Sequence, residues 1–293
     1  MRVFLIGASG QVGHELRLCL RGTELTAPAR SELDLGDLAA LREALAAARP
    51  QVIVNSAAYT DVDGAEKNRE AALRLNRDAV ALLGEYARDT RTALIHYSTD
   101  FVFDGTKGTP YVEDDATNPL SVYGASKLAG ENALRELDAP ALVLRTAWVY
   151  SLRRKSFVSA ILRFAREKSE LKIVDDQVGN PTYCADLAEA TARLIDKFAP
   201  DPYAACDSRR GVYHLAGGGS VDRFRFARRI LELDPNRDQQ QARVLIPVAS
   251  SEFVTPAQRP LFAPLDCGKI ERELGLRLPA WEDALSRALN RGS

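Results

Sequence analysis

The chain has 293 residues, of which 46% are hydrophobic and 27% are charged, and its formal net charge at pH 7 is −1. This composition predicts one large or two small globular domains with a substantial core. The near-neutral charge gives no sign of a nucleic-acid partner or of binding to an anionic membrane surface. The longest apolar runs are far shorter than the ~20 residues that a membrane-spanning helix needs.

The cysteines and histidines point away from disulfide, metal and redox chemistry. No cysteine pair has the spacing of a metal or redox motif, because the four are widely scattered: Cys19, Cys184, Cys206 and Cys267. Unpaired thiols suit a reducing compartment, which predicts a cytoplasmic protein. His96 and His214 lie in apolar, strand-like runs, so core or sheet-edge positions are expected for both.

The first predicted element is a strand at residues 2–6, followed at once by Gly7, Gly10 and Gly13 and then by a helical apolar pattern. Strand, glycine turn and helix form the context of a dinucleotide-binding loop. Glycines permit a tight turn and let backbone N–H groups approach a pyrophosphate at the helix N-terminus. The spacing is G-x-x-G-x-x-G rather than G-x-G-x-x-G, and a glycine-rich turn without a ligand is the alternative.

Further short apolar segments alternate with helical patterns through the first half of the chain. Strands are expected at 25–27, 51–55, 93–97 and 141–145, and helices around 38–45 and 73–87. The strands are apolar throughout rather than alternating, which indicates a parallel sheet covered on both faces. With right-handed crossovers, the predicted fold class is α/β, a doubly wound Rossmann sheet.

The pattern loosens after about residue 148. Helices are expected around 157–164 and 185–198, strands at 171–174 and 212–215, and a loop-rich tail where prolines accumulate. We therefore predict an NAD(P)-binding Rossmann domain at residues 1–148, with returns near 185–217. Residues 149–293 are expected to form mainly a smaller, substrate-binding lobe.

Tyr123 and Lys127 lie four residues apart in a helical pattern, so both should occupy one helix face. A nearby cation favours the phenolate, which predicts a lowered pKa for Tyr123 and a usable proton donor near neutral pH. Taken alone, this spacing also occurs on ordinary surface helices.

Polar segments follow each predicted strand, where ligands of such sheets bind. They span residues 55–60, 98–105 and 146–150, and they can converge with the glycine loop on one site. The hydroxyl of Thr99 falls in the second segment, although a strand-end hydroxyl that caps a turn is an alternative. Trp148 falls in the third, where core filling is the alternative.

The glycine spacing, Thr99 after the fourth strand and the Y-x-x-x-K pattern together resemble the extended short-chain dehydrogenase/reductases. Within that group, five segments resemble the dTDP-4-dehydrorhamnose reductase family, at residues 54–66, 97–105, 145–150, 176–182 and 211–215. Their order and spacing extend the resemblance over nearly the whole chain.

The resemblance implies NADPH- or NADH-dependent reduction of the 4-keto group of dTDP-4-dehydro-6-deoxy-L-mannose to dTDP-L-rhamnose. Tyr123 would donate a proton to the carbonyl oxygen as general acid. Thr99 would donate a hydrogen bond to the same oxygen. Lys127 would lower the pKa of the tyrosine and hold the nicotinamide ribose.

The same resemblance implies which residues surround the cofactor and the substrate. Cofactor contacts are expected at the pyrophosphate (Gly10, Gln11, Val12), the adenine (Asp34, Leu35), the cofactor ribose and phosphates (Ala58, Tyr59, Thr60) and the nicotinamide side (Tyr97). Asp34 is alternatively a helix-start residue. Asp100 and Trp148 are expected to face the sugar nucleotide, and Arg259 to contact its diphosphate.

The segment after the second strand bears on cofactor choice. An acidic residue there would bind the ribose 2′-OH and favour NAD, but residues 26–31 contain none. Arg30 can pair with a 2′-phosphate instead. We therefore predict a preference for NADPH over NADH.

Some features depart from the family pattern or leave alternatives open. Arg259 and Pro260 of a C-terminal family stretch are present, but Phe262 and Ala263 replace its polar side chains, which leaves the sugar and nucleotide open. Magnesium is implied by resemblance only, through a carboxylate at the position of Glu15, for which solvated surface charge is the alternative. A homodimer is a further option that the resemblance offers.

Two other functions compete with the reductase. The first is a related sugar-nucleotide epimerase or dehydratase; here Asp100 is followed by Phe101 rather than glutamate, which argues against dehydration. The second is a non-catalytic, NADP-binding regulatory subunit, against which the complete set of Thr99, Tyr123 and Lys127 argues.

Overall fold

Six parallel strands form the central sheet of the computed structural model, which describes residues 1–291. Their spatial order is β10-β5-β4-β3-β1-β2. In chain order they are β1 (Arg2–Ile6), β2 (Glu24–Thr26), β3 (Val52–Asn55), β4 (Ala93–Thr99), β5 (Ala141–Thr146) and β10 (Gly211–His214). The order reverses beside β1, so the doubly wound Rossmann sheet predicted from the sequence is confirmed.

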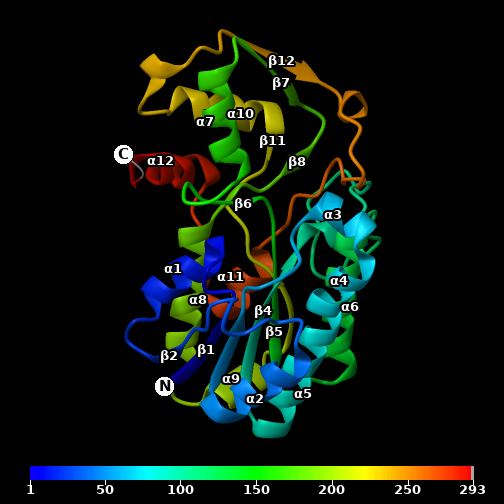
Figure 1. Ribbon diagram of the computed structural model, residues 1–293, viewed down its shortest axis with the longest axis vertical. Helices are drawn as coiled ribbons and strands as arrows, with labels where there is room; N and C mark the ends of the chain where they lie inside the picture. Colours follow the sequence, from blue (N-terminus) through cyan, green and yellow to red (C-terminus); the bar gives the residue numbers. More distant parts are fainter. Residues whose placement is uncertain (292–293) are drawn as a thin grey trace.

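Helices cover both faces of this sheet (Figure 1). One face packs against α1 (Gln11–Cys19), α8 (Cys184–Phe198), α9 (Pro202–Asp207) and α11 (Gly268–Leu274). The other packs against α2 (Leu38–Ala48), α5 (Ala79–Thr90) and α6 (Val122–Glu136). Neighbouring residues of β1 enter different cores, Val3 the first and Phe4 the second, which is why the strand is apolar throughout.

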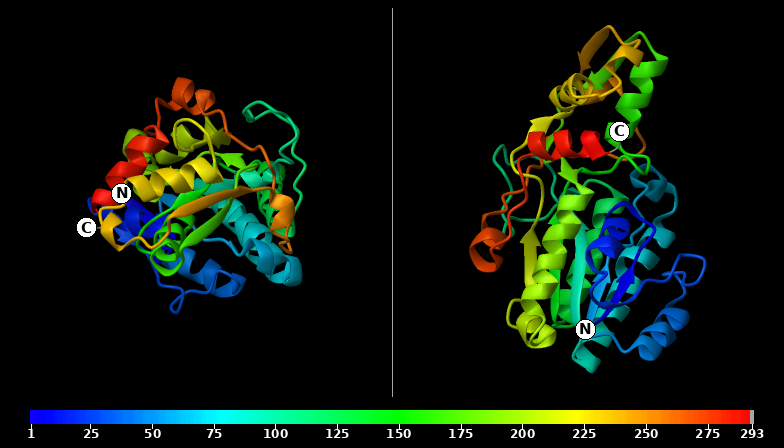
Figure 2. Two further views of the ribbon diagram at one scale, coloured as in Figure 1. Left: turned by 90° about the horizontal axis from the view of Figure 1, so that it is seen from above. Right: turned by 90° about the vertical axis from the view of Figure 1, so that its left-hand side faces the viewer.

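A smaller lobe lies beyond the carboxyl ends of the sheet strands, at the top of Figure 1 and of the right-hand view of Figure 2. It holds α7 (Phe157–Glu167), α10 (Arg223–Glu232), α12 (Trp281–Arg291) and the parallel pair β7 (Glu170–Val174) and β12 (Val244–Val248). Two-residue strands link it to the sheet domain: β6 (Val149–Tyr150), β8 (Val178–Gly179), β9 (Thr182–Tyr183) and β11 (Val221–Asp222). Its core centres on Phe226, against which Tyr150, Phe157 and Trp281 pack.

The short elements between these complete the fold. After β3 come α3 (Val62–Lys67), α4 (Arg69–Leu73) and the π-helical turn η1 (Arg74–Asp78), which interrupts the single helix expected at 73–87. The 3₁₀ turns are η2 (Asp100–Val102), η3 (Arg237–Gln239) and η4 (Ser250–Glu252).

The C-terminal part contains more regular structure than its prolines suggested. Pro247 lies in β12, an edge strand that pairs only with β7, and edge strands are where sheets accept proline. Helix α12 lies on the side of the lobe that faces the sheet domain (Figure 2), where Arg287 Nη2 lies 2.8 Å from Asp186 of α8. Within residues 1–291, no helix is long and apolar enough to cross a membrane, and no disulfide joins the cysteines.

Candidate functional site

Two glycines let α6 approach the carboxyl end of β4 very closely. A Cβ at Gly124 would lie 2.2 Å from the Phe101 carbonyl oxygen, and one at Gly130 would lie 2.1 Å from the Asn76 carbonyl oxygen. Any larger residue at either position would push the helix away from η2 or η1. This close packing sets the positions of Tyr123 and Lys127, which α6 carries.

The Tyr123 hydroxyl lies close enough to the side chain of Thr99 for the two to interact electrostatically. Thr99 Oγ1 in turn donates to Asp100 Oδ1 at 3.1 Å and accepts from the Phe101 N–H at 3.2 Å. Thr99 therefore caps the turn after β4, as the alternative considered for it predicts, while its role toward a substrate carbonyl stays a prediction. The other carboxyl oxygen of Asp100 is buried and has no hydrogen-bond partner among residues 1–291.

The protonation of this cluster differs from the sequence expectation. Burial raises the pKa of Tyr123 to about 12, and the Asp100 carboxylate acts in the same direction while the Thr99 side chain opposes both. The expected lowering by Lys127 is not seen, and the Lys127 amine contacts the Tyr97 carbonyl oxygen and His96 instead. A raised pKa keeps the phenol protonated at neutral pH, which a general acid requires.

Lys127 is buried beneath α6 and contacts β4. Its Nζ donates to the Tyr97 carbonyl oxygen at 2.7 Å and lies 3.2 Å from His96 Nε2. Burial lowers the pKa of Lys127 to about 8, and it lowers the pKa of His96 well below 6.5. The other His96 nitrogen lies 3.1 Å from the side-chain amide of Asn55 at the end of β3. His96 is therefore buried in the core, as expected, and also contacts Lys127 of the proposed site.

The glycine loop has the geometry that a phosphate group needs. Gly7 adopts a φ of +84°, and a Cβ at Gly13 would lie 2.1 Å from the Gly7 carbonyl oxygen. Gly10 precedes α1 and offers no side-chain cap, so the first backbone N–H groups of the helix, including those of Gln11 and Val12, stay open to an anion. The side-chain oxygen of Gln11 is buried here without a partner in the described chain.

Asn76, which the sequence reasoning missed, connects the segment after β3 to α6. Its side chain accepts from Tyr59 N at 2.8 Å, and its amide donates to Tyr59 O at 3.1 Å and to Ser126 Oγ at 2.9 Å. Ser126 then donates to the Tyr123 carbonyl oxygen at 2.7 Å. The segment Ala58–Tyr59–Thr60 is thereby tied to the catalytic candidates. Asn76 could have been noticed in the sequence, because it is a polar residue on the apolar face of the helix expected at 73–87.

The residues predicted near the adenine lie around β2 and the loop that follows it. Arg30 is exposed, and Asp34 Oδ1 accepts from the Gly36 N–H at 2.9 Å. Asp37 rather than Asp34 caps α2, so the helix-start alternative for Asp34 does not apply. Leu35 is 7% exposed and packs in the core on that side of the sheet.

Tyr97 and Trp148, both predicted site residues, are fixed in position by packing against neighbouring residues. The Tyr97 hydroxyl lies 2.6 Å from Thr191 Oγ1 of α8, which directs its ring into the core. Trp148 has a φ of +43°, a strained value for a non-glycine residue. Its ring lies against Gly179, where a Cβ would be 2.6 Å from Cε2, and it stays half-buried.

Arg259 forms an ion pair rather than standing free. Its Nη2 lies 2.8 Å from Asp63 Oδ2 of α3, and its Nη1 donates to Thr255 Oγ1 at 2.6 Å and to Ala257 O at 3.0 Å. Pro260 and the following residues pass close to Gly105, which has a φ of +78° and where a Cβ would lie 2.8 Å from Leu261 N.

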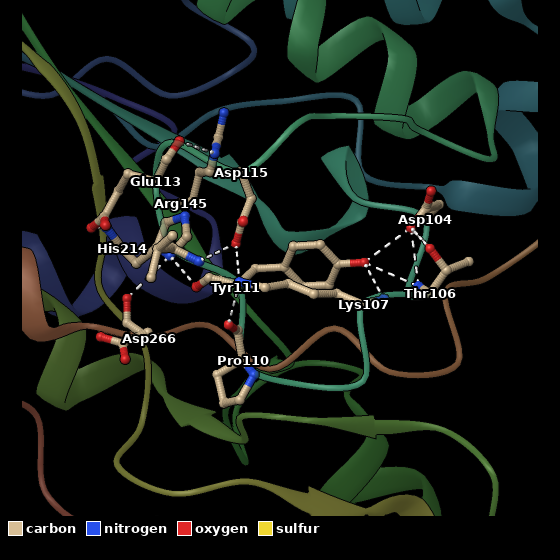
Figure 3. A network of polar contacts seen from close by, with 11 residues as sticks. Asp104, Thr106, Lys107, Pro110, Tyr111, Glu113, Asp115, Arg145, His214 and Asp266 are labelled. Atoms are coloured by element: carbon tan, nitrogen blue, oxygen red, sulfur yellow. Dashed lines mark hydrogen bonds and ion pairs between the residues drawn. The ribbon is translucent and has the colours of Figure 1, made fainter.

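Tyr111 anchors this C-terminal stretch to the sheet domain (Figure 3). Its hydroxyl donates to Asp104 at 2.9 Å, and its backbone N–H donates to Pro264 O at 2.8 Å. His214 Nδ1 lies 3.1 Å from the carbonyl oxygens of both Tyr111 and Asp266. The stretch that carries Arg259 is thus fixed both by backbone contacts at Tyr111 and by the ion pair between Arg259 and Asp63.

A second arginine, Arg223, was not singled out from the sequence. It is the first residue of α10, and its guanidinium carbon lies 3.4 Å from the centroid of the Trp148 ring. Its charge is also close enough to Asp100 to interact with that carboxyl group electrostatically.

The described residues give no support for a metal site. Within residues 1–291, no group of three or more histidine, cysteine, aspartate or glutamate side chains is placed to hold an ion. Glu15, the carboxylate considered for magnesium, lies half-buried on α1.

Comparison with known proteins gives full-length matches. A family model described as "RmlD substrate binding domain" matches residues 1–293. A dTDP-4-dehydrorhamnose reductase of Burkholderia thailandensis is 39% identical, covering 97% of both chains. One from Escherichia coli K12 is 36% identical, covering 99% of this chain and 97% of the relative. The crystal structure of dTDP-4-dehydrorhamnose reductase from Bacillus anthracis in complex with NADP superposes with a TM-score of 0.89 at 31% identity, covering 99% of each chain.

Proposed function

Because the chain belongs to the RmlD substrate-binding-domain family of dTDP-4-dehydrorhamnose reductases, we propose that it reduces the 4-keto group of dTDP-4-dehydro-6-deoxy-L-mannose with NADPH to give dTDP-L-rhamnose. The resemblance predicted from the sequence is confirmed. The observation that carries the proposal is the placement of the Tyr123 phenol beside the Thr99 side chain at the carboxyl end of β4. A protonated phenol and a second hydroxyl there can share one carbonyl oxygen.

Each residue of the cluster has a defined task in this reaction. The chemistry that a bound NADPH would supply is hydride transfer to the carbonyl carbon. Tyr123 donates its proton to the oxygen on which negative charge develops, and Thr99 turns its hydroxyl from Asp100 toward that oxygen. Lys127 is held by the Tyr97 carbonyl oxygen beside the proposed nicotinamide position, where its amine can bond the ribose.

The residues of the glycine loop fit the pyrophosphate of a dinucleotide. A side chain at Gly7 would meet the Ser56–Ala57 backbone after β3, and one at Gly13 would meet the Gly7 carbonyl oxygen. The open N–H groups at Gln11 and Val12 suit an anion. The partnerless side-chain oxygen of Gln11 can accept a hydrogen bond from a bound cofactor. The NADP bound by the Bacillus anthracis relative supports the same assignment.

Turnover is tested directly by mixing the protein with dTDP-4-dehydrorhamnose and NADPH and following NADPH absorbance. We expect Tyr123→Phe to lower kcat by about 10²–10⁴-fold, the usual contribution of a positioned general acid, while NADPH binding measured by fluorescence is retained. Tyr203→Phe, on α9, is the matched control and should behave like the wild type. Normal turnover by Tyr123→Phe would remove the proposed proton donor.

The same assay separates the alternatives. An epimerase or dehydratase would change the sugar without net NADPH consumption, and a regulatory subunit would bind NADPH without any turnover. Parallel reactions with dTDP- and UDP-linked 4-keto sugars address the nucleotide, which Phe262 and Ala263 leave open. The homodimer and the cytoplasmic location expected from the sequence stay predictions.

Cofactor choice is tested at Arg30, which is exposed in the loop after β2. We expect Arg30→Glu to lower kcat/KM for NADPH by about tenfold or more while leaving that for NADH unchanged, since only NADPH carries the 2′-phosphate. Arg21→Glu, exposed just before β2, is the control for charge reversal alone. A wild-type preference for NADH would contradict the assignment.

A further inference from the structure

Arg223 is held in place by aromatic rings rather than by acidic partners. Its guanidinium carbon lies 3.4 Å from the Trp148 ring centroid and 4.8 Å from that of Phe157. Its backbone N–H donates to Gln177 O at 3.1 Å, which fixes the start of α10. A planar guanidinium stacked in this way keeps its N–H donors directed outward, around the edge of the stack.

The ring beneath the guanidinium is itself fixed. Trp148 has a φ of +43°, and the backbone of Gly179 lies directly against the ring, where a Cβ would be 2.6 Å from Cε2. Strained backbone of this kind persists only where the surroundings impose it, and it gathers at functional sites. With Gly179 against the ring and Arg223 stacked on it, the group presented to a ligand is the guanidinium more than the indole face.

Within residues 1–291, the guanidinium of Arg223 makes no hydrogen bond and no ion pair. The contrast with Arg259 is clear, because that guanidinium is engaged by Asp63, Thr255 and Ala257. Arg223 is half-buried, and its unused N–H donors are open to a ligand.

Three charges meet around this position. Burial lowers the pKa of Arg223 to about 9, the nearby Asp100 carboxylate opposes that change, and the Arg259 charge adds to it. The two arginines are thus close enough to repel each other. An anion bound beside both would relieve that repulsion and would supply the acceptors that Arg223 lacks.

We propose that Arg223 binds the diphosphate of the nucleotide sugar, with Arg259 as the second cation on the same group. This inference rests on the proposed function, which puts the sugar carbonyl at Tyr123 and Thr99. The diphosphate is the anionic group attached to that sugar, and Arg223 interacts with Asp100, the residue next to Thr99. The cofactor phosphates are assigned elsewhere, to the glycine loop and to Arg30. The guanidinium also offsets the charge of Asp100, which would otherwise repel a phosphate.

The test uses calorimetric titration of the full chain with dTDP, thymidine 5′-monophosphate and inorganic pyrophosphate. We expect Arg223→Gln to weaken dTDP and pyrophosphate binding by about 10- to 100-fold, as for loss of a charge-assisted pair of hydrogen bonds, with a smaller loss for the monophosphate. Arg223→Lys keeps the positive charge but loses the forked pair of N–H donors. Its affinity for dTDP and pyrophosphate should therefore lie between those of the wild type and Arg223→Gln. NADPH affinity should not change in either variant.

Arg225→Gln is the matched control, because Arg225 is on the same helix and is exposed, with its Nε 3.3 Å from Asp222. It should bind every probe as the wild type does. If Arg223→Gln does not fold, Arg223→Lys carries the test, and wild-type dTDP affinity in that variant together with an unchanged dependence on salt would overturn the proposal.

The outcomes separate this inference from the proposed function. Arg223-dependent dTDP binding without reduction of the 4-keto sugar would refute the reductase and leave the diphosphate site standing. Normal reduction, with the same KM in Arg223→Gln as in the wild type, would refute the diphosphate site alone. A wild-type protein that binds none of the diphosphate probes would refute this inference as well.

Discussion

Lys127 shows how the site sets the protonation of a single residue. It is 2% exposed, and its Nζ lies between the Tyr97 carbonyl oxygen and His96 Nε2. Because Asn55 Oδ1 accepts from the Ala57 N–H, its amide faces His96 Nδ1 as a donor. The neutral imidazole then carries its proton on Nε2, facing Lys127. Burial lowers the pKa of Lys127 to about 8, and we infer that this proton disfavours the ammonium in the same direction.

We therefore predict that His96→Gln raises the pKa of Lys127, because the glutamine side-chain oxygen can accept a hydrogen bond from the ammonium. The alkaline limb of the kcat/KM profile, where Lys127 loses its proton, should move upward by about one pH unit, as for removal of an opposing interaction of ~1.4 kcal/mol. The measurement is kcat/KM for the 4-keto sugar against pH with NADPH saturating.

His14→Gln on α1 provides the control for loss of a histidine outside this network. A His96→Gln protein with lower kcat but an unmoved alkaline limb would show that His96 only packs under α6. The position of His96 was open to prediction, since side chains alternate along β4 and Tyr97 enters the opposite core. The effect of His96 on Lys127 could not be predicted, because the direction of the Lys127 amine depends on how closely α6 packs against η1 and η2.

At the scale of elements, the site depends on the fit of α6 against two short turns. Gly124 meets the Phe101 carbonyl oxygen of η2, and Gly130 meets the Asn76 carbonyl oxygen of η1. The π-helical turn at η1 places Asn76, which is fully buried, where it joins Tyr59 to Ser126. Such turns often mark functional positions in helices.

We predict that Gly130→Ala destabilises the protein by about 1–3 kcal/mol and lowers kcat about tenfold or more, because the added methyl group must displace α6 from η1. Helix propensity alone favours alanine by about 1 kcal/mol, so a loss of stability isolates the steric contact. Urea unfolding and steady-state kinetics measure the two effects. Gly22→Ala, at a position with open space around it, is the control, and a Gly130→Ala protein as stable and active as the wild type would contradict this account.

The secondary structure was easier to predict from the sequence in the first half of the chain than in the second. The strands of the sheet were predictable because each is a short apolar run that both cores require, as Val3 and Phe4 show. The turn at Asn76 was not, because its neighbours keep a helical pattern and only tertiary contacts widen the turn. Helix α12 was missed although Trp281, Leu285 and Leu289 recur at helical spacing and are buried, because nearby prolines dominated the reading of the tail.

At the scale of the whole molecule, buried titratable groups couple folding to pH. His214 is fully buried and contacts the Tyr111 and Asp266 carbonyl oxygens, so it joins β10, the loop after β4 and the C-terminal stretch. Burial, aided by the charge of Arg145, lowers the pKa of His214 from 6.5 to about 3. Asp100 acts in the opposite sense, since burial raises its pKa from 3.8 to about 7.

The signs of these two contributions differ. The unfolded chain protonates His214 below pH 6.5 whereas the folded chain does not until about 3, so stability from this residue is lost as the pH falls through that window. For Asp100 the folded chain holds the proton more tightly, so its contribution is lost as the pH rises from 3.8 to about 7. Because the two contributions oppose each other, the slope of the unfolding free energy against pH in the wild type does not isolate the contribution of His214. A comparison with a variant does.

We predict that His214→Asn lowers the unfolding free energy at neutral pH, because the asparagine amide replaces only one of the imidazole contacts. This difference in unfolding free energy between the two proteins should shrink by about 1.4 kcal/mol per pH unit as the pH falls below the histidine pKa of 6.5 in the unfolded chain. Urea unfolding of both proteins at several pH values between about 7 and 4 measures the difference. His14→Asn, on α1, is the control for replacing a histidine that contacts neither the Tyr111 nor the Asp266 carbonyl oxygen. A constant deficit across the range would mean that His214 is protonated within the folded protein, and its role in linking three segments to acid stability would then be lost.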